Sequence, residues 1–269
     1  NSSEYIIGGF QTAASFYKDA SKIIEAFKTG NGLPWGEHDP DLYQSVERFF
    51  RPSYRTNIAS SWIPSLDNRR VQEKLKTESA LVADVGCGRG ISTIFMAKAY
   101  PNSKFIGFDN HEDSIKKARR LAREEGLSEE QIKFETSSST NYPQFYPEIN
   151  QQYDLITFFD CLHDMGDPVG AASHALNSLK SDGTVMIVEP FANDKLEDNL
   201  NPLGRISYAV STMVCVPASM AANGPALGTQ VGKAKISQVM KAGGFSHFMH
   251  TTQTPFDQIP VLVIYEARP

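Results

Sequence analysis

A glycine-rich turn directly after an apolar segment constrains this chain more than any other feature of its sequence. Residues 82–90 read V-A-D-V-G-C-G-R-G, so that an apolar strand runs into three alternating glycines. Further along, a second apolar segment at 105–108 ends at Asp109. A strand, a glycine turn and a carboxylate at the end of the next strand together favour a binding site for a nucleoside cofactor.

The spacing of the glycines distinguishes between cofactors. A dinucleotide fingerprint reads G-x-G-x-x-G, and its third glycine lets helix and strand pack closely beside a pyrophosphate. Here Ile91 occupies that position, and the last glycine, Gly90, comes one residue earlier. An NAD-dependent oxidoreductase is therefore disfavoured. The G-x-G-x-G sequence resembles motif I of the class I S-adenosylmethionine-dependent methyltransferases, and this resemblance implies S-adenosylmethionine as cofactor and S-adenosylhomocysteine as product.

The cofactor site is expected to use the glycine turn and the ends of the following strands. Asp109 is placed to accept hydrogen bonds from the ribose hydroxyls, as an acidic residue does in dinucleotide folds. Ser138 is the nearest match to an acidic residue that holds the adenine amine in the resembling family. The expected cofactor-binding residues are Asp84, Gly86, Gly88, Gly90, Asp109, Asn110, Ser138 and Asp160.

Two of these carboxylates have alternative roles. Asp84 and Asp160 are both expected near the amino group of the cofactor. Asp84 also suits the orientation of the loop backbone, and Asp160 also suits a turn at the end of its strand. Asp160 and Glu189 end neighbouring predicted strands, but a divalent ion of the hard, oxygen-liganded kind needs more converging ligands than these. No catalytic metal is expected.

His163 is the best candidate for a catalytic base. An imidazole titrates near neutrality and suits the removal of a hydroxyl proton, and Asp164 or another carboxylate could orient it. The surrounding string L-H-D-M-G-D-P at 162–168 resembles the L-H-D-W-S-D segment of small-molecule O-methyltransferases, in which the histidine is the base. Met165 replaces the tryptophan of that pattern. Capping of the next helix, or core packing, is the alternative role for His163.

Short apolar segments alternate with helical patterns through the middle of the chain. Predicted strands cover 80–85, 105–109, 131–136, 154–160 and 184–189, and predicted helices cover 91–99, 112–125 and 168–180. Gly183 is expected to stop the last of these helices. Such alternation predicts βαβ units in an α/β fold. With a terminal hairpin at 245–267, we expect a Rossmann-like sheet of seven mostly parallel strands with an antiparallel edge strand.

Two segments lie outside this predicted sheet. Residues 1–70 are expected to form a helical N-terminal cap or linker, and 71–269 the S-adenosylmethionine-binding domain. Within that domain, residues 191–232 are expected to form a helical lid inserted after the fifth strand. Because ligands in such folds bind outside the carboxyl ends of the strands, the cap and the lid are expected to wall the acceptor site.

Composition limits the partners. The net charge of −5 disfavours a nucleic acid, because nucleic-acid binding rests on lysine and arginine that neutralise phosphates. No apolar run is long enough for a membrane span, and no signal sequence is visible. The 3 cysteines are widely spaced, which favours a reducing, cytoplasmic location. A small molecule is thus the expected acceptor, and a homodimer is left open.

The resemblance extends beyond motif I. The strings L-P-W-G-E-H at 33–38, F-F-R-P-S-Y at 49–54 and E-P-F-A-N-D at 189–194 are similar to those of a group in which a winged-helix domain precedes the methyltransferase domain. No winged helix is visible before Tyr5. We therefore expect a methyltransferase that acts on a small molecule, at a hydroxyl oxygen. A catalytically silent, cofactor-binding regulator that works with a DNA-binding domain outside this chain is the alternative.

Overall fold

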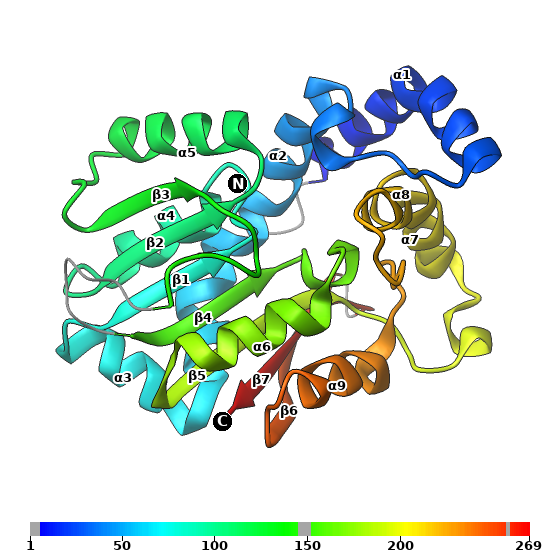
Figure 1. Ribbon diagram of the computed structural model, residues 1–269. Helices are drawn as coiled ribbons and strands as arrows, with labels where there is room; N and C mark the ends of the chain where they lie inside the picture. The colour runs from blue at the N-terminus through cyan, green and yellow to red at the C-terminus, as the bar shows by residue number, and fades with distance from the viewer. Residues whose placement is uncertain (1–5, 145–151, 257–258) are drawn as a thin grey trace.

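The computed structural model describes residues 6–144, 152–256 and 259–269. Within them, seven strands form a sheet in the order β3-β2-β1-β4-β5-β7-β6, with helices on both faces (Figure 1). The strands are β1 (Leu81–Val85), β2 (Lys104–Asp109), β3 (Ile132–Thr136), β4 (Tyr153–Phe159), β5 (Leu179–Pro190), β6 (His247–Phe256) and β7 (Ile259–Arg268). The predicted α/β fold is confirmed.

The central strands are parallel and buried. Every residue of β1 and of β4 is buried, as apolar strands covered by helices on both faces require. The connecting helices are α4 (Ile91–Ala99), α5 (Glu112–Glu124) and α6 (Pro168–Ser178). The chain moves outward from β1 to β3 and then returns to β4 beside β1. This reversal creates the crevice in which ligands of open α/β sheets bind.

The C-terminal hairpin completes the sheet. Helix α9 (Gly232–Ala242) connects β5 to β6, and a crossover of this kind sets β6 parallel to β5 with room for one strand between them. β7 fills that place and pairs antiparallel with both neighbours. The antiparallel strand predicted from the hairpin is therefore present, with β6 outside it at the edge of the sheet.

The end of α6 differs from its prediction. The helix stops at Ser178, and Leu179 is already extended and pairs with Tyr153 of β4. The predicted stop, Gly183, lies inside β5, next to an irregularity in the pairing. A Cβ on Gly183 would lie 2.8 Å from Leu179 Cδ2. Gly183 thus serves close packing at this irregularity and does not end the helix.

The N-terminal segment is helical. It contains α1 (Ile7–Thr29), a short turn (Trp35–Glu37), α2 (Pro40–Asn57), a π-helical turn (Ile58–Trp62), a 3-10 turn (Ile63–Arg69) and α3 (Arg70–Thr77). Trp62 is fully buried and donates a hydrogen bond from Nε1 to Thr254 Oγ1 at 2.7 Å. Its ring shares one apolar core with Tyr54, Phe159 and the sheet. The second half of this segment is therefore part of the main core.

The insertion after β5 contains a 3-10 turn (Leu196–Asn199), α7 (Pro202–Met213) and α8 (Cys215–Ala221). In Figure 1, α7 and α8 lie next to α1, away from the sheet. The Leu33 amide donates to the Pro217 carbonyl at 3.0 Å. Leu42 packs in one cluster with Val214 and Cys215. The N-terminal helices, called the cap from here on, thus contact α7 and α8, called the lid.

Candidate functional site

The three motif glycines differ in what surrounds them. Their φ angles of 73°, 52° and 79° lie in the left-handed region, which glycine adopts without strain. A Cβ on Gly86 would lie 2.7 Å from Cys161 Sγ, and one on Gly90 would lie 2.6 Å from the Phe134 ring. A Cβ on Gly88 would meet no atom within 4 Å. The turn therefore packs at both ends and exposes its middle backbone to open space, which suits close approach of a ligand.

Asp109 lies at the carboxyl end of β2, beside this turn. Its Oδ2 accepts a hydrogen bond from the Gly88 amide at 2.8 Å, and its Oδ1 accepts one from the His111 amide at 2.8 Å. Burial raises the pKa of Asp109, although both amide hydrogen bonds oppose that rise. The two features on which the sequence prediction depends, the glycine turn and the strand-end carboxylate, are in direct contact.

Asp84 lies below the turn. Its side chain is fully buried, and its carboxylate accepts hydrogen bonds from Ser92 Oγ and Thr93 Oγ1 at 2.6 Å each and from Thr157 Oγ1 at 2.9 Å. These hydroxyls belong to the first turn of α4 and to β4. Burial raises the pKa of Asp84, against the three hydroxyl donors. This arrangement favours the loop-orienting role of Asp84 over direct contact with a cofactor.

The remaining predicted cofactor residues lie around the crevice. Asn110 and Ser138 are exposed, and Ser138 Oγ lies 3.3 Å from Thr140 Oγ1. Asp160 follows β4 with a φ of 53°, and its amide donates to the Val188 carbonyl at 2.7 Å. A left-handed conformation at a residue other than glycine costs roughly 1–3 kcal/mol and tends to occur at ligand sites. Burial raises the pKa of Asp160 to about 8, although His163 opposes it.

His163 lies on a 3-10 turn (Leu162–Asp164) after β4 and is 1% exposed. Its Nδ1–H donates a short hydrogen bond to Glu189 Oε2, while Oε1 of the same carboxylate accepts from the Leu162 amide at 3.1 Å. Burial alone would lower the pKa of His163, but the carboxylate of Glu189 and contact with Cys215 hold it well above its usual value. With Nδ1 bound, Nε2 is the nitrogen left for chemistry.

Sequence reasoning did not identify Glu189 as the partner of His163. The sequence suggests Asp164 or another carboxylate as the orienting group, and it suggests Glu189 by number only as a possible metal ligand. Glu189 is the last residue of β5 before Pro190, and β5 pairs with β4. The predicted order of neighbouring strands was therefore a signal, because residues at the carboxyl ends of adjacent parallel strands meet at one edge of the sheet.

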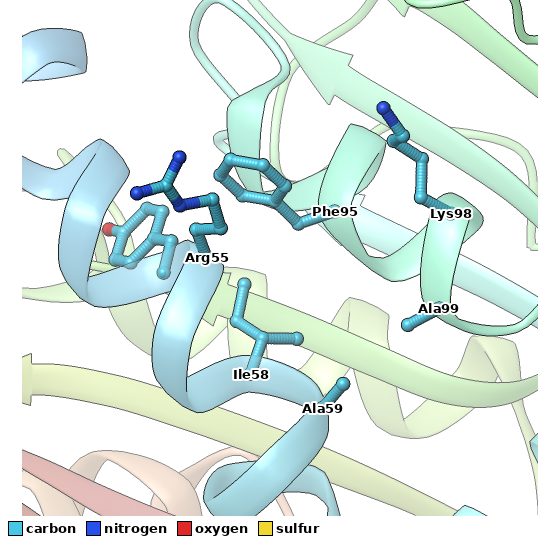
Figure 2. Close-up of a pocket in the computed structure, with 7 residues that line it drawn as sticks. Arg55, Ile58, Ala59, Phe95, Lys98 and Ala99 are labelled. Carbon is cyan, nitrogen blue, oxygen red and sulfur yellow. The ribbon is translucent and has the colours of Figure 1, made fainter. Parts of the chain in front are cut away.

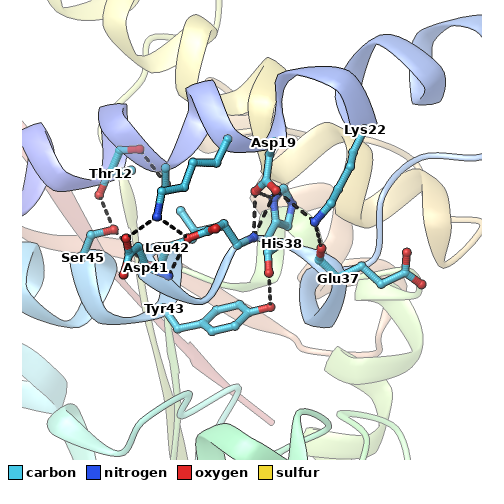
Figure 3. Close-up of polar contacts among 12 residues, drawn as sticks. Thr12, Asp19, Lys22, Glu37, His38, Asp41, Leu42, Tyr43 and Ser45 are labelled. Atoms are coloured by element: carbon cyan, nitrogen blue, oxygen red, sulfur yellow. Dashed lines mark hydrogen bonds and ion pairs between the residues drawn. The ribbon is translucent and has the colours of Figure 1, made fainter.

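The cap contacts the glycine turn and the end of β2. Arg89 Nε lies 3.1 Å from Glu47 Oε2 of α2, and the Tyr43 ring packs on the His111 ring with centroids 4.7 Å apart. Tyr43 Oη donates to the His38 carbonyl at 3.1 Å (Figure 3). A pair of buried side chains supports this arrangement, because His38 Nδ1–H donates to Asp19 at 2.9 Å. None of these contacts was predicted from the sequence.

A cavity of about 310 Å³ lies between α2, the π-helical turn and α4 (Figure 2). Two basic side chains stand beside an otherwise apolar lining, which consists of Tyr54, Arg55, Ile58, Ala59, Phe95, Lys98 and Ala99. Within this lining there is no carboxylate or imidazole that could remove a proton. The crevice beside Asp109 and His163 therefore remains the candidate active site.

A seven-stranded sheet with a glycine turn and a strand-end carboxylate at its switch point is typical of the class I S-adenosylmethionine-dependent methyltransferases. The sequence model of a methyltransferase domain family matches residues 76–244. Since this match covers more than half of the chain, the chain belongs to that family. The class predicted from motif I, and with it the cofactor, is confirmed.

Individual relatives are more distant. The ubiquinone biosynthesis O-methyltransferase of Actinobacillus pleuropneumoniae serotype 5b is 30% identical over 105 residues, which are 39% of this chain and 43% of that enzyme. The chain thus spans less than half the length of the curated relative it matches. The solved human N-acetylserotonin methyltransferase, in complex with S-adenosylmethionine, is 17% identical, with a TM-score of 0.58 over 95% of this chain and 67% of that one.

Another solved structure is an O-methyltransferase from neocarzinostatin biosynthesis, in complex with S-adenosylhomocysteine and 1,4-dihydroxy-2-naphthoic acid. It is 16% identical, with a TM-score of 0.61, over 96% of this chain and 70% of that one. At these identities the likeness to both solved structures shows a shared fold.

Across the described residues, no helix combines the length and apolar character that a membrane crossing requires.

Proposed function

We propose that this chain transfers a methyl group from S-adenosylmethionine to a hydroxyl oxygen of a small molecule and releases S-adenosylhomocysteine. The observation that carries the proposal is the pair of His163 and Glu189 at the carboxyl ends of β4 and β5. These ends lie at the same edge of the sheet as the glycine turn after β1. A base whose ring is oriented by a carboxylate suits the removal of a hydroxyl proton.

The chain's residues fit the cofactor. When bound, S-adenosylmethionine supplies an electrophilic methyl group. The open space at Gly88 suits the close approach of its chain, and no phosphate-binding glycine is needed. We assign the ribose to Asp109, whose two oxygens have acceptor capacity left beyond their amide bonds. The cap contacts the glycine turn through Glu47 and Arg89, and the lid contacts His163 through Cys215, which supports alignment of the reactants and exclusion of water.

The proton balance follows from the orientation of His163. As the bond between the acceptor oxygen and the methyl carbon forms and the sulfur–carbon bond breaks, the hydroxyl proton passes to Nε2 of His163. The carboxylate of Glu189, which holds Nδ1–H, would stabilise the resulting imidazolium. The proton leaves to solvent before the next turnover. Glu189 thus positions His163 and does not take the proton from the acceptor.

The acceptor is proposed to be a phenol-like molecule. The cluster that joins cap and lid is apolar and partly aromatic, and it comprises Phe16, Trp35, Leu42, Val46, Met213, Val214 and Cys215. Such an apolar cluster favours a flat aromatic ring over a phosphate-rich partner, and the net charge of −5 supports this preference. The neocarzinostatin enzyme, solved with a dihydroxynaphthoic acid, supports the same class. The free thiols are compatible with a cytoplasmic location.

The test compares donor binding with turnover. Purified protein is incubated with S-adenosylmethionine and a panel of phenols that includes 1,4-dihydroxy-2-naphthoic acid, and release of S-adenosylhomocysteine is measured. His163→Ala should leave donor affinity nearly unchanged but lower turnover by about 100-fold or more. An unchanged rate in this variant would assign His163 to packing. Donor binding without turnover for any phenol, amine or thiol acceptor would favour the silent regulator instead.

A further inference from the structure

Three possible metal ligands converge beside the catalytic crevice. His163 and Asp164 lie on the turn after β4, and Cys215 begins α8 of the lid. One imidazole nitrogen, one carboxylate oxygen and the thiol sulfur all lie within 4.8 Å of one another. Zinc binds such atoms at about 2.0–2.3 Å, so ligand atoms in a tetrahedral site are roughly 3.4 Å apart. A side-chain movement of about 1 Å would therefore complete the site.

The imidazole is already oriented as in a zinc site. Metal-ligating histidines almost always donate their second ring N–H to a carboxylate or carbonyl, which fixes the ring and the tautomer. His163 makes this contact through Nδ1–H to Glu189, and the Leu162 amide holds the same carboxylate. Nε2 is thus the ring nitrogen that remains for a metal, and Cys215 lies within hydrogen-bond reach of the imidazole.

Further carboxyl groups surround His163. Asp160, His163 and Glu189 form a second group whose ligand atoms also lie within 4.8 Å of one another. Three carboxylates, counting Asp164, therefore face one imidazole. Burial raises the pKa of Asp164 to about 7 and that of Asp160 to about 8, with His163 as the opposing charge on each. A bound divalent ion would lower these pKa values and hold the carboxyl groups in the ionised form that binds a metal.

The ligand types select the metal. A thiolate and an imidazole suit zinc, whereas magnesium and calcium prefer oxygen ligands alone. On binding, Cys215 would release its thiol proton to solvent, because the thiolate is the ligand. Three protein ligands leave the fourth position for water, as in zinc sites that stay open. Cobalt(II), which takes the same geometry, serves as a spectroscopic probe.

We propose that His163, Asp164 and Cys215 form a binding site for zinc or a similar thiophilic divalent cation, which links the lid to the turn after β4. The proposal rests on this geometry and does not depend on the proposed methyl transfer. It has a consequence for that reaction, because a bound metal takes the lone pair of Nε2. Metal occupancy and the role of His163 as a base therefore exclude each other, and zinc would inhibit a reaction that uses this base.

The test is a cobalt(II) titration of the metal-free full chain, followed by competition with zinc. The expected result is one equivalent of cobalt with a thiolate-to-cobalt absorption band. Cys215→Ser should abolish the band and weaken zinc binding by more than about 100-fold, since it removes a ligand. Glu189→Gln should weaken zinc binding by about 10- to 100-fold, since it removes the partner of the ligating ring.

Cys161→Ser is the matched control. Cys161 lies on the same loop, but its thiol contacts the Val85 carbonyl at 3.3 Å, so the cobalt band should persist. A missing band in the unaltered protein, or a band that survives Cys215→Ser, would overturn the site. If thermal melts show that Cys215→Ser is unfolded, Asp164→Asn decides through the same loss of zinc affinity. Cobalt binding without zinc inhibition would leave the site in place and contradict the base role of His163 instead.

Discussion

At the scale of single residues, Asp109 joins two loops. It accepts the Gly88 amide through one oxygen and the His111 amide through the other, so the carboxylate orders the turn as well as facing the proposed ribose. Asp109→Ala should lower affinity for S-adenosylhomocysteine by about 2 kcal/mol or more, because the sugar hydroxyls and the Gly88 amide lose their acceptor. Calorimetry measures this loss. Glu112→Ala, at an exposed position on α5, is the control, and equal affinities would remove Asp109 from the site.

His38 gives a prediction about pH. Burial lowers its pKa, although the carboxylate of Asp19 opposes that effect. A histidine whose pKa is lower in the folded state than in the unfolded state stabilises the fold above the unfolded value of about 6.5. That contribution is lost as the pH falls. The contribution of His38 to the free energy of unfolding in urea should therefore drop between about pH 7 and pH 5.5.

The variant His38→Gln isolates this effect. Its side chain does not titrate, so the free energy of unfolding should fall less steeply over the same pH range than in the unaltered protein. The difference between the two slopes, rather than either slope alone, belongs to His38. Identical slopes would show that His38 keeps an ordinary pKa in the fold.

At the scale of elements, the contact between cap and lid depends on a close backbone approach. A Cβ on Gly32 would lie 2.3 Å from the Pro217 carbonyl oxygen and 2.4 Å from the Ala221 nitrogen, both in α8. Gly30 has a similar left-handed φ of 74°, compared with 70° at Gly32, but a Cβ there would meet nothing within 4 Å. A substitution at Gly30 therefore tests backbone strain alone, whereas a substitution at Gly32 adds a collision with the lid.

Alanine at each of these positions tests the contact. Gly30→Ala should destabilise the protein by about 1–2 kcal/mol, through the left-handed backbone alone. Gly32→Ala should destabilise it further and raise the KM for the acceptor, because α8 must move away from the cap. Urea unfolding and steady-state kinetics measure the two effects. Equal losses of stability in both variants would mean that the lid does not rest on Gly32.

At the scale of the whole molecule, the end of the cap belongs to the same core as the sheet. Trp62 is 0% exposed and packs near Tyr54 and Phe159. Its indole N–H donates a hydrogen bond to Thr254 of β6. The chain should therefore unfold in one transition. Trp62→Ala should lower its stability by about 3–5 kcal/mol. Tyr17→Ala, at a side chain on α1 that is 85% exposed, should change it by less than about 0.5 kcal/mol. A separate early transition for the N-terminal helices would contradict this view.

Much of the architecture follows from local patterns in the sequence. The glycines of the turn and the alternation of strands and helices determine the fold class, because backbone conformation and strand burial depend on nearby residues. Motif I and Asp109 likewise predict the class of cofactor. Where the local signal was ambiguous, as at Gly183, the pairing of Leu179 with Tyr153 overrode it.

The contacts between groups far apart in the sequence depend on how the elements pack. Glu189 reaches His163 because β5 pairs with β4, and Cys215 reaches the same histidine because the lid folds back against the cap. The Asp84 carboxylate accepts hydrogen bonds from hydroxyl groups of α4 and β4. Residue types and their spacing indicate which chemistry a chain can perform. The partner of a buried charge depends instead on packing between elements that are far apart in the sequence. A local sequence pattern does not determine that packing.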